Sequence, residues 1–218
     1  MTTPPPIVAA GAAIEAASFQ LIEAQAGDHS CYEARQWSLV RRLIHTSGDF
    51  DFNGLTCFHP QAVNSGITAL RRGGKIIVDA EMIRAGITRR RLQPLGLSVL
   101  QWNAEPAVIA AAQATGTTRS TQAIRQLWQA GHLSGSVVAI GNAPTALLEV
   151  IRLIQEEQCL PALILGLPVG FISAAESKEV LMALEAPPWI TIRGSKGGST
   201  LAVAALHALL DMALESTP

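Results

Sequence analysis

The chain has 218 residues, a length that suits one compact domain, and its 49% apolar residues are enough to form a large core. Only 15% of the residues are charged, and the net charge of −1 argues against nucleic acid as the main partner. Apolar runs are too short or too interrupted for a membrane span, and the start lacks the features of a signal peptide. Because the cysteines (Cys31, Cys57, Cys159) are few and widely spaced, we expect reduced thiols in a cytoplasmic protein.

Residues 1–11 are expected to form an extended N-terminal arm, and residues 12–218 a single domain. A helix is predicted for residues 12–26. The residues expected on its buried face are Ile14, Ala17, Leu21 and Ile22. Ser18 falls inside this arc, where its hydroxyl either bonds back to a carbonyl one turn earlier or meets a ligand.

Residues 38–45 plot as an amphipathic helix, which Gly48 should end. The residues predicted to be buried are Trp37, Val40, Leu43 and Ile44, and the opposite arc holds Ser38, Arg41, Arg42 and His45. An imidazole beside fixed positive charge can exchange protons near neutrality and face an anionic ligand. The alternative interpretation is a solvated basic face with a histidine at its end.

Short apolar runs alternate with helical segments along the rest of the chain. The predicted strands are residues 56–58, 75–78, 97–100, 136–140, 162–165 and 189–192. The predicted helices are residues 60–72, 105–114, 120–131, 144–157, 174–184 and 200–213. This alternation predicts an α/β fold with a mostly parallel sheet and helices on both faces.

Two kinds of strand-end feature are candidates for ligand contacts. Asp79 and Glu81 follow a predicted strand, where open α/β sheets place ligands, although acids also favour a helix N-terminus. Glycine-rich turns can offer backbone N–H groups to an anion, although tight-turn geometry explains each of them alone. These turns are residues 141–145, 166–170 and 193–199. The three-arginine run at residues 89–91 is expected to be a solvated surface.

Several common sites are disfavoured by their missing motifs. The glycine-rich turns contain neither a dinucleotide fingerprint nor a P-loop, and the chain has no GxSxG elbow. The spacings of His45, Asp49 and His59 match no metal pattern, and His29, His132 and His207 are interpreted as surface or structural residues. We therefore expect no metal site.

Ten short segments between residues 12 and 210 occur together in an order and spacing that are highly specific. They are residues 13–15, 18–19, 42–50, 79–82, 86–89, 118–120, 141–147, 168–171, 176–178 and 196–199. With these segments, the chain resembles the precorrin-8X methylmutase family of cobalamin biosynthesis, including its cobalt-precorrin-8 form.

The resemblance implies an isomerase that moves a methyl group from C-11 to C-12 of a tetrapyrrole, giving hydrogenobyrinate or cobyrinate. The shift is formally a [1,5]-sigmatropic rearrangement without redox change or cofactor. A family histidine assists by exchanging a proton with the macrocycle, and His45 is the match. Substrate contacts of the family fall on Ser18 and Arg42. Family members are homodimers with active sites near the interface, and the low surface charge of this chain agrees with that.

Thr88, Arg89 and Arg119 lie in matched segments and are further candidates for binding the polar edge of the substrate. The chain departs from the family pattern at Ser195, where arginine is common, and at His207, where asparagine is common. Two alternatives stay open: a non-catalytic tetrapyrrole-binding or product-carrier protein, and a nucleotide-binding α/β enzyme.

Overall fold

A sheet of six strands in the order β1-β6-β5-β4-β2-β3 runs through the computed structural model, which describes residues 11–215. The strands are β1 (Thr56–Phe58), β2 (Lys75–Val78), β3 (Ser98–Leu100), β4 (Val137–Ile140), β5 (Leu163–Gly166) and β6 (Trp189–Ile192). Every neighbouring pair is parallel except β1 and β6, which are antiparallel. The prediction of a mostly parallel sheet is confirmed, and each predicted strand is present within one residue at either end.

Alternate residues of the central strands point into two separate cores, as the pleat requires. In β2, Ile76 packs into one core and Ile77 into the other, and Val137 and Val138 of β4 divide in the same way. Because both faces are covered, these strands are continuous apolar runs rather than alternating ones.

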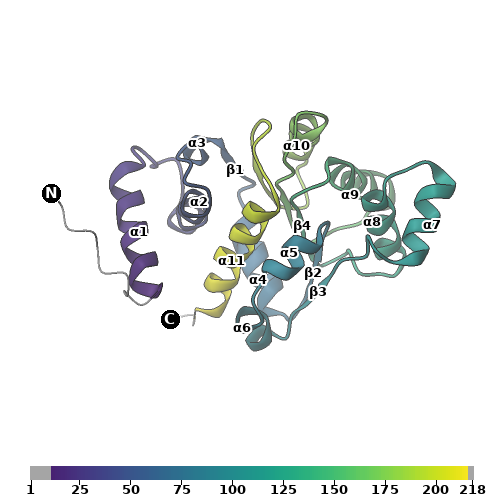
Figure 1. The fold of residues 1–218 in the computed structure, drawn as a ribbon, viewed down its shortest axis with the longest axis horizontal. Helices are drawn as coiled ribbons and strands as arrows, with labels where there is room; N and C mark the ends of the chain where they lie inside the picture. The colour runs from purple at the N-terminus through teal and green to yellow at the C-terminus, as the bar shows by residue number, and fades with distance from the viewer. Residues whose placement is uncertain (1–10, 216–218) are drawn as a thin grey trace.

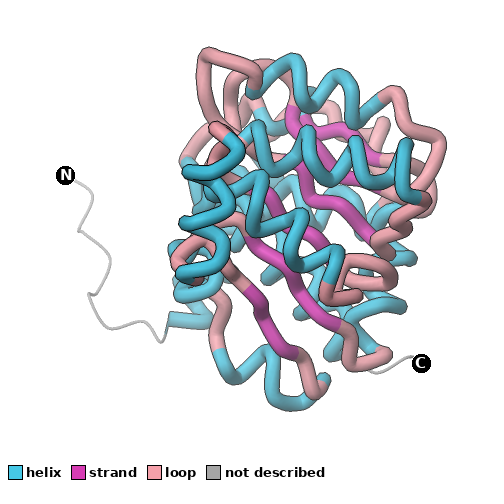
Figure 2. Tube along the Cα trace, turned by 90° about the vertical axis from the view of Figure 1, so that its right-hand side faces the viewer, coloured by secondary structure: helices cyan, strands magenta, loops and turns pink. Residues whose placement is uncertain are grey.

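Helices form a layer on each face of the sheet (Figures 1 and 2). The first core includes residues of α2 (Ala34–Ser47), α4 (Ala62–Arg71), α5 (Glu81–Gly86) and α11 (Ser199–Leu214). The second includes residues of α8 (Arg119–Gln129), α9 (Pro144–Glu157) and α10 (Ala174–Met182), with α7 (Pro106–Thr115) packed against α8. Short elements that the sequence analysis did not predict are α3 (Phe52–Leu55), α5, α6 (Arg89–Leu92) and the 3₁₀ turn η1 (Gln93–Leu95).

Helix α1 (Gly11–Gln25) lies at the outer edge of the molecule and packs on α2 (Figure 1). Its predicted buried face is wrong: Ile14 is 55% exposed, Leu21 is 61% exposed, and Ala17 is also exposed. Only Ile22 of the predicted set is buried. The polar residues of this helix are spread around it, so its periodicity selects no single face, and the contact with α2 decides which side is covered. The predicted N-terminal arm, apart from Gly11, lies outside the described residues.

Helix α11 is buried on nearly every side, as its composition predicted, because α2, α4 and α5 all pack against it. Cys31, Cys57 and Cys159 are free thiols. Across residues 11–215, every helix is too short or too polar to cross a lipid bilayer.

Candidate active site

His45 lies in the last turn of α2, and the local sequence fixes where that helix begins and ends. Glu33 and Gln36 form a capping box at its start, and Gly48 adopts the left-handed conformation at its end with φ of 69°. The apolar face is buried as predicted through Trp37, Val40, Leu43 and Ile44. His45 is therefore carried on an element whose position is set by the main core.

The hydroxyl of Ser18 hydrogen-bonds Nδ1 of His45 across 2.7 Å, joining α1 to α2. The ring of Phe19 packs against the imidazole at a centroid distance of 5.1 Å. Both side chains come from α1, and they leave His45 half-buried rather than solvated. No described residue hydrogen-bonds Nε2 of His45, so this nitrogen is free to meet a ligand.

Arg42 is held by two carboxylates from distant parts of the chain. Its guanidinium donates to Glu15 at 2.8 Å and to Asp211 at 3.3 Å. Asp211 also accepts two hydrogen bonds from Arg91, at 2.6 and 3.0 Å, and Arg91 contacts the Thr88 hydroxyl at 3.4 Å. The network places Thr88, by way of Arg91 and Asp211, in the same polar cluster as Arg42, one turn of helix from His45.

The sequence analysis missed three members of this cluster: Glu15, Phe19 and Asp211. The signal for Asp211 was present, since it is the one charged residue in the apolar helix α11. The expectation that residues 89–91 form a solvated surface is wrong for Arg91, because Asp211 draws it into the cluster, where its side chain is only 13% exposed.

Arg89 and Arg119, the other predicted contacts, lie apart from His45 in this chain. Arg89 is exposed and lines a cavity of about 620 Å³ between α5 and α6, together with Thr88. Arg119 is the exposed first residue of α8, whose N-terminus is capped by Thr118. Figure 1 shows α8 and α2 on opposite sides of the sheet.

Asp79 fills the place that an anion was expected to take. Its buried carboxylate accepts backbone N–H groups from Gly141, Asn142 and Ala143 at 2.9, 2.9 and 2.6 Å. Burial raises the pKa of Asp79, against the opposing effect of these hydrogen bonds. The turn at residues 141–145 thus offers these donors to its own chain, and Ala143 is the N-cap residue of α9.

The two remaining glycine-rich turns are bonded to each other. Gly170 donates its N–H to Ser195 at 3.1 Å, and Gly198 donates to Leu167 at 2.8 Å. The side chain of Lys196 reaches Asp49 and Asp51, at 2.6 Å in each case. Lys196, Asp49 and Asp51 therefore form an ion-pair group just beyond the end of α2.

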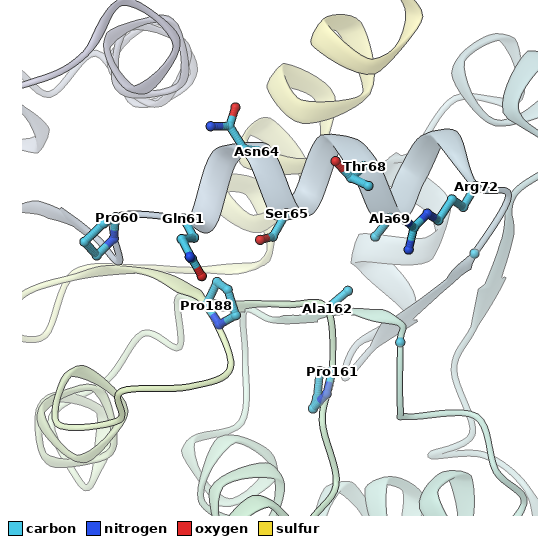
Figure 3. A pocket seen from close by; sticks show the side chains of 12 residues that line it. Pro60, Gln61, Asn64, Ser65, Thr68, Ala69, Arg72, Pro161, Ala162 and Pro188 are labelled. Atoms are coloured by element: carbon cyan, nitrogen blue, oxygen red, sulfur yellow. The ribbon is translucent and has the colours of Figure 1, made fainter.

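Two cavities bear on where a ligand could enter. One of about 310 Å³ lies just past the end of α2, lined by Ser47, Asp49, Lys196 and neighbouring residues. A larger groove of about 670 Å³ lies at the opposite, amino-terminal ends of the parallel strands (Figure 3). Its lining is mainly proline, amide and hydroxyl side chains, and Arg72 is the only charged residue in it. That groove lacks acid–base groups, so the end of α2 is the better candidate site.

The described residues contain no group of three or more potential metal ligands of the kinds His, Cys, Asp and Glu. His59, which was considered as a ligand, hydrogen-bonds the carbonyl of Glu185 across 2.9 Å. His29 stacks on Trp37 at a centroid distance of 4.0 Å.

His207 belongs to the Asp211 cluster, and its environment makes stability depend on pH. Burial, assisted by the charge of Arg91, lowers the pKa of His207 to about 4. Between pH 6.5 and 4, His207 binds a proton in the unfolded chain but not in the folded chain, so acidification should lower the free energy of unfolding. We expect a loss of about 1–2 kcal/mol from this residue, after discounting for its contact with solvent.

His207→Asn should remove that component, because an amide does not titrate. Urea unfolding of the wild type and the variant across pH 7 to 4 measures it: the difference between their unfolding free energies should change by about 1–2 kcal/mol. A difference that does not change with pH would contradict the assignment.

Comparisons with known proteins identify the family of the chain. Residues 13–212 match the family described as precorrin-8X methylmutase. The chain is 45% identical to a cobalt-precorrin-8 methylmutase of Leptospira interrogans over 92% of this chain and 93% of the relative. It is 42% identical to a precorrin-8X methylmutase of a Sinorhizobium species, covering 91% and 93%. The crystal structure of precorrin-8X methylmutase from Thermus thermophilus superposes with a TM-score of 0.87 at 46% identity, covering 93% and 96%. The chain therefore belongs to the precorrin-8X methylmutase family, whose members are isomerases that transfer a methyl group within one molecule.

Proposed function

We propose that the chain moves a methyl group from C-11 to C-12 of precorrin-8X or cobalt-precorrin-8, with His45 as proton donor and acceptor. The observation that carries the proposal is the Ser18–His45 hydrogen bond of 2.7 Å. With Nδ1–H donating to the Ser18 hydroxyl, the ring presents Nε2, which no described residue hydrogen-bonds. A ring oriented in this way can give the Nε2 proton to the macrocycle as an imidazolium and take it back as a neutral imidazole.

In the proposed reaction the bond from the methyl carbon to C-11 breaks and a bond to C-12 forms, with no change of oxidation state. Protonation of the macrocycle by Nε2 lowers the barrier to this migration, and return of the proton to Nε2 regenerates the enzyme. General acid–base catalysis of this kind typically contributes about 10²–10⁴ in rate.

The substrate is a broad ring edged with carboxylates, and Arg42 retains donors for one of them. A guanidinium has five N–H groups, and the described residues use two of those on Arg42. Thr88 is linked to Arg42 through Arg91 and Asp211. Arg89 and Arg119 would take part only as contacts to more distant edges of the ring, or to a ring bound by a second subunit.

The direct test is to mix the purified protein separately with precorrin-8X and with cobalt-precorrin-8 and to follow the visible spectrum. We expect the corrin chromophore to appear with at least one of them, and the comparison decides which is used. Binding of both without conversion would favour the non-catalytic carrier. Failure of either ring to bind, with stabilisation by nucleotides, would favour the nucleotide-binding alternative.

We further propose that the chain is a homodimer in which the outer face of α1 meets the second subunit. Ile14 and Leu21 leave an apolar stripe on this helix, directly beside Ser18, whose hydroxyl bonds His45. A dimer contact here would lie next to the catalytic histidine.

Leu21→Glu should therefore halve the mass measured by light scattering, because it places a charge in the apolar contact. The matched control is Leu160→Glu, since Leu160 is similarly exposed at 56% but lies between α9 and β5. The control should keep the wild-type mass. A Leu21→Glu protein with unchanged mass would place any dimer contact elsewhere.

A further inference from the structure

Lys178 of α10 is a buried cation that no carboxylate neutralises. Its residue is 0% exposed, and among the described residues no acidic side chain lies within ion-pair distance of it. Its one hydrogen bond is from Nζ to the backbone carbonyl of Lys196, at 2.7 Å. Burial lowers the pKa of Lys178 to about 8, which reflects the cost of holding an ammonium group away from water.

An apolar side chain of similar length would fill the same space at lower cost to the fold, since buried charges are often replaced by apolar groups without loss of stability. Stability therefore does not explain why a lysine stands at this position. An apolar residue could not make the hydrogen bond to the Lys196 carbonyl. The role of Lys178 therefore lies in the segment that this hydrogen bond holds.

The segment that Lys178 holds is packed with little freedom. A Cβ added to Gly197 would come within 2.3 Å of the Leu167 carbonyl and 2.6 Å of the Pro168 carbonyl. Gly198 donates to Leu167 as well, at 2.8 Å. The backbone around Lys196 therefore packs closely against the loop that follows β5, and the buried Lys178 holds it through the hydrogen bond to the Lys196 carbonyl.

From this fixed backbone the Lys196 side chain extends to the turn that follows α2. Its Nζ lies 2.6 Å from carboxylate oxygens of both Asp49 and Asp51. Asp49 in turn donates its N–H to the Ser47 hydroxyl at 3.2 Å, directly after the helix that carries His45. Three hydrogen bonds in series therefore connect Lys178 to Ser47, the last residue of α2.

We propose that Lys178 is a positioning residue: by holding the Lys196 carbonyl it sets the bridge to Asp49 and Asp51, and so the place of the His45 imidazole relative to the substrate. This inference rests on the proposed catalytic role of His45. Displacements near 1 Å at a reacting group can cost about 10²-fold in rate, so a residue that anchors the end of α2 through a series of hydrogen bonds can matter.

The test compares Lys178→Met and Lys196→Met, singly and together, with Lys75→Met as the matched control. Lys75 also makes one recorded hydrogen bond, to His132 at 2.6 Å, but it lies at the amino-terminal end of β2. The measurements are kcat and KM, the midpoint of urea unfolding, and the ring NMR signals of His45, assigned by their loss in His45→Ala.

For Lys178→Met we expect an unfolding midpoint at or above that of the wild type, a fall in kcat of about tenfold or more, and KM within about twofold. The His45 signals should shift, and the double variant should be no slower than the slower single variant. Lys75→Met should retain wild-type kcat and His45 signals.

Wild-type kcat with unshifted His45 signals in Lys178→Met would overturn the inference. It would also be overturned if the fold-loss of kcat in the double variant equalled the product of the fold-losses in the two single variants. If Lys178→Met does not fold, the inference is tested with Lys196→Met, because the Lys196 side chain is partly exposed. The same two measurements, kcat and the His45 signals, apply. A wild-type protein without turnover would instead refute the proposed function, and the NMR comparison would still test the linkage.

Discussion

His45→Ala is expected to lower kcat by about 10²–10⁴, because it removes the group that exchanges a proton with the ring. Binding of the tetrapyrrole should change by no more than about tenfold, or roughly 1.4 kcal/mol. The imidazole is one contact among many to a large ring, whereas the proton transfer depends on it alone. Stopped-flow or steady-state spectra give the rate, and fluorescence or absorbance titration gives the affinity.

The matched control is His59→Ala. His59 is another half-buried histidine, but it directly follows the edge strand β1 and hydrogen-bonds the carbonyl of Glu185 rather than a residue of α1. Its removal should leave both rate and affinity near wild type. Full turnover by His45→Ala would reject acid–base catalysis by this residue. A loss of affinity as large as the loss of rate would show that His45 binds the ring rather than working on it.

Asp79→Ala should lower the free energy of unfolding by about 4 kcal/mol, the largest stability effect that we expect from one polar side chain here. The substitution leaves three backbone N–H groups of residues 141–143 without their acceptor, in a place that water reaches poorly. Each unsatisfied buried donor costs about 1–3 kcal/mol. Urea denaturation with a comparison of midpoints and slopes measures the change.

Glu81→Ala is the control for that experiment, since Glu81 is the other carboxylate at the same strand end. It is exposed and pairs only with Arg84, three residues later in α5. Exposed ion pairs contribute about 0–1 kcal/mol, so the control should be close to wild type. A loss below about 1 kcal/mol in Asp79→Ala would mean that the turn finds other acceptors, and that Asp79 is available to a ligand after all.

Both experiments distinguish a structural role of a carboxylate or a histidine from a role in contacting the ligand. Asp79 was a candidate for ligand contact because it ends a parallel strand, and its bonds make it a structural acceptor instead. His45 was a candidate because of its neighbours in the helix, and its bond to Ser18 places it where a ligand role is still open.

The strands and most of the helices could be predicted from the sequence, because their signals are local. Continuous apolar runs such as residues 189–192 can be buried only between two layers, and Gly48 ends α2 by a backbone conformation that glycine adopts readily. The family resemblance likewise rests on short segments in a fixed order, and the match over residues 13–212 confirms it. The sequence by itself thus determined the fold class, the family and the histidine to examine.

The tertiary structure alone decided which groups meet. Nothing local chooses a face for α1, because its polar residues are spread around the helix, and its contact with α2 is what turns Ser18 toward His45. The pairing of Arg42 and Arg91 with Asp211 joins residues up to 169 positions apart. Lys196 is likewise neutralised by two aspartates far away in sequence. Hydrogen bonds and ion pairs depend on distances of a few ångströms, and only the packing of the whole chain sets distances between segments so remote from each other.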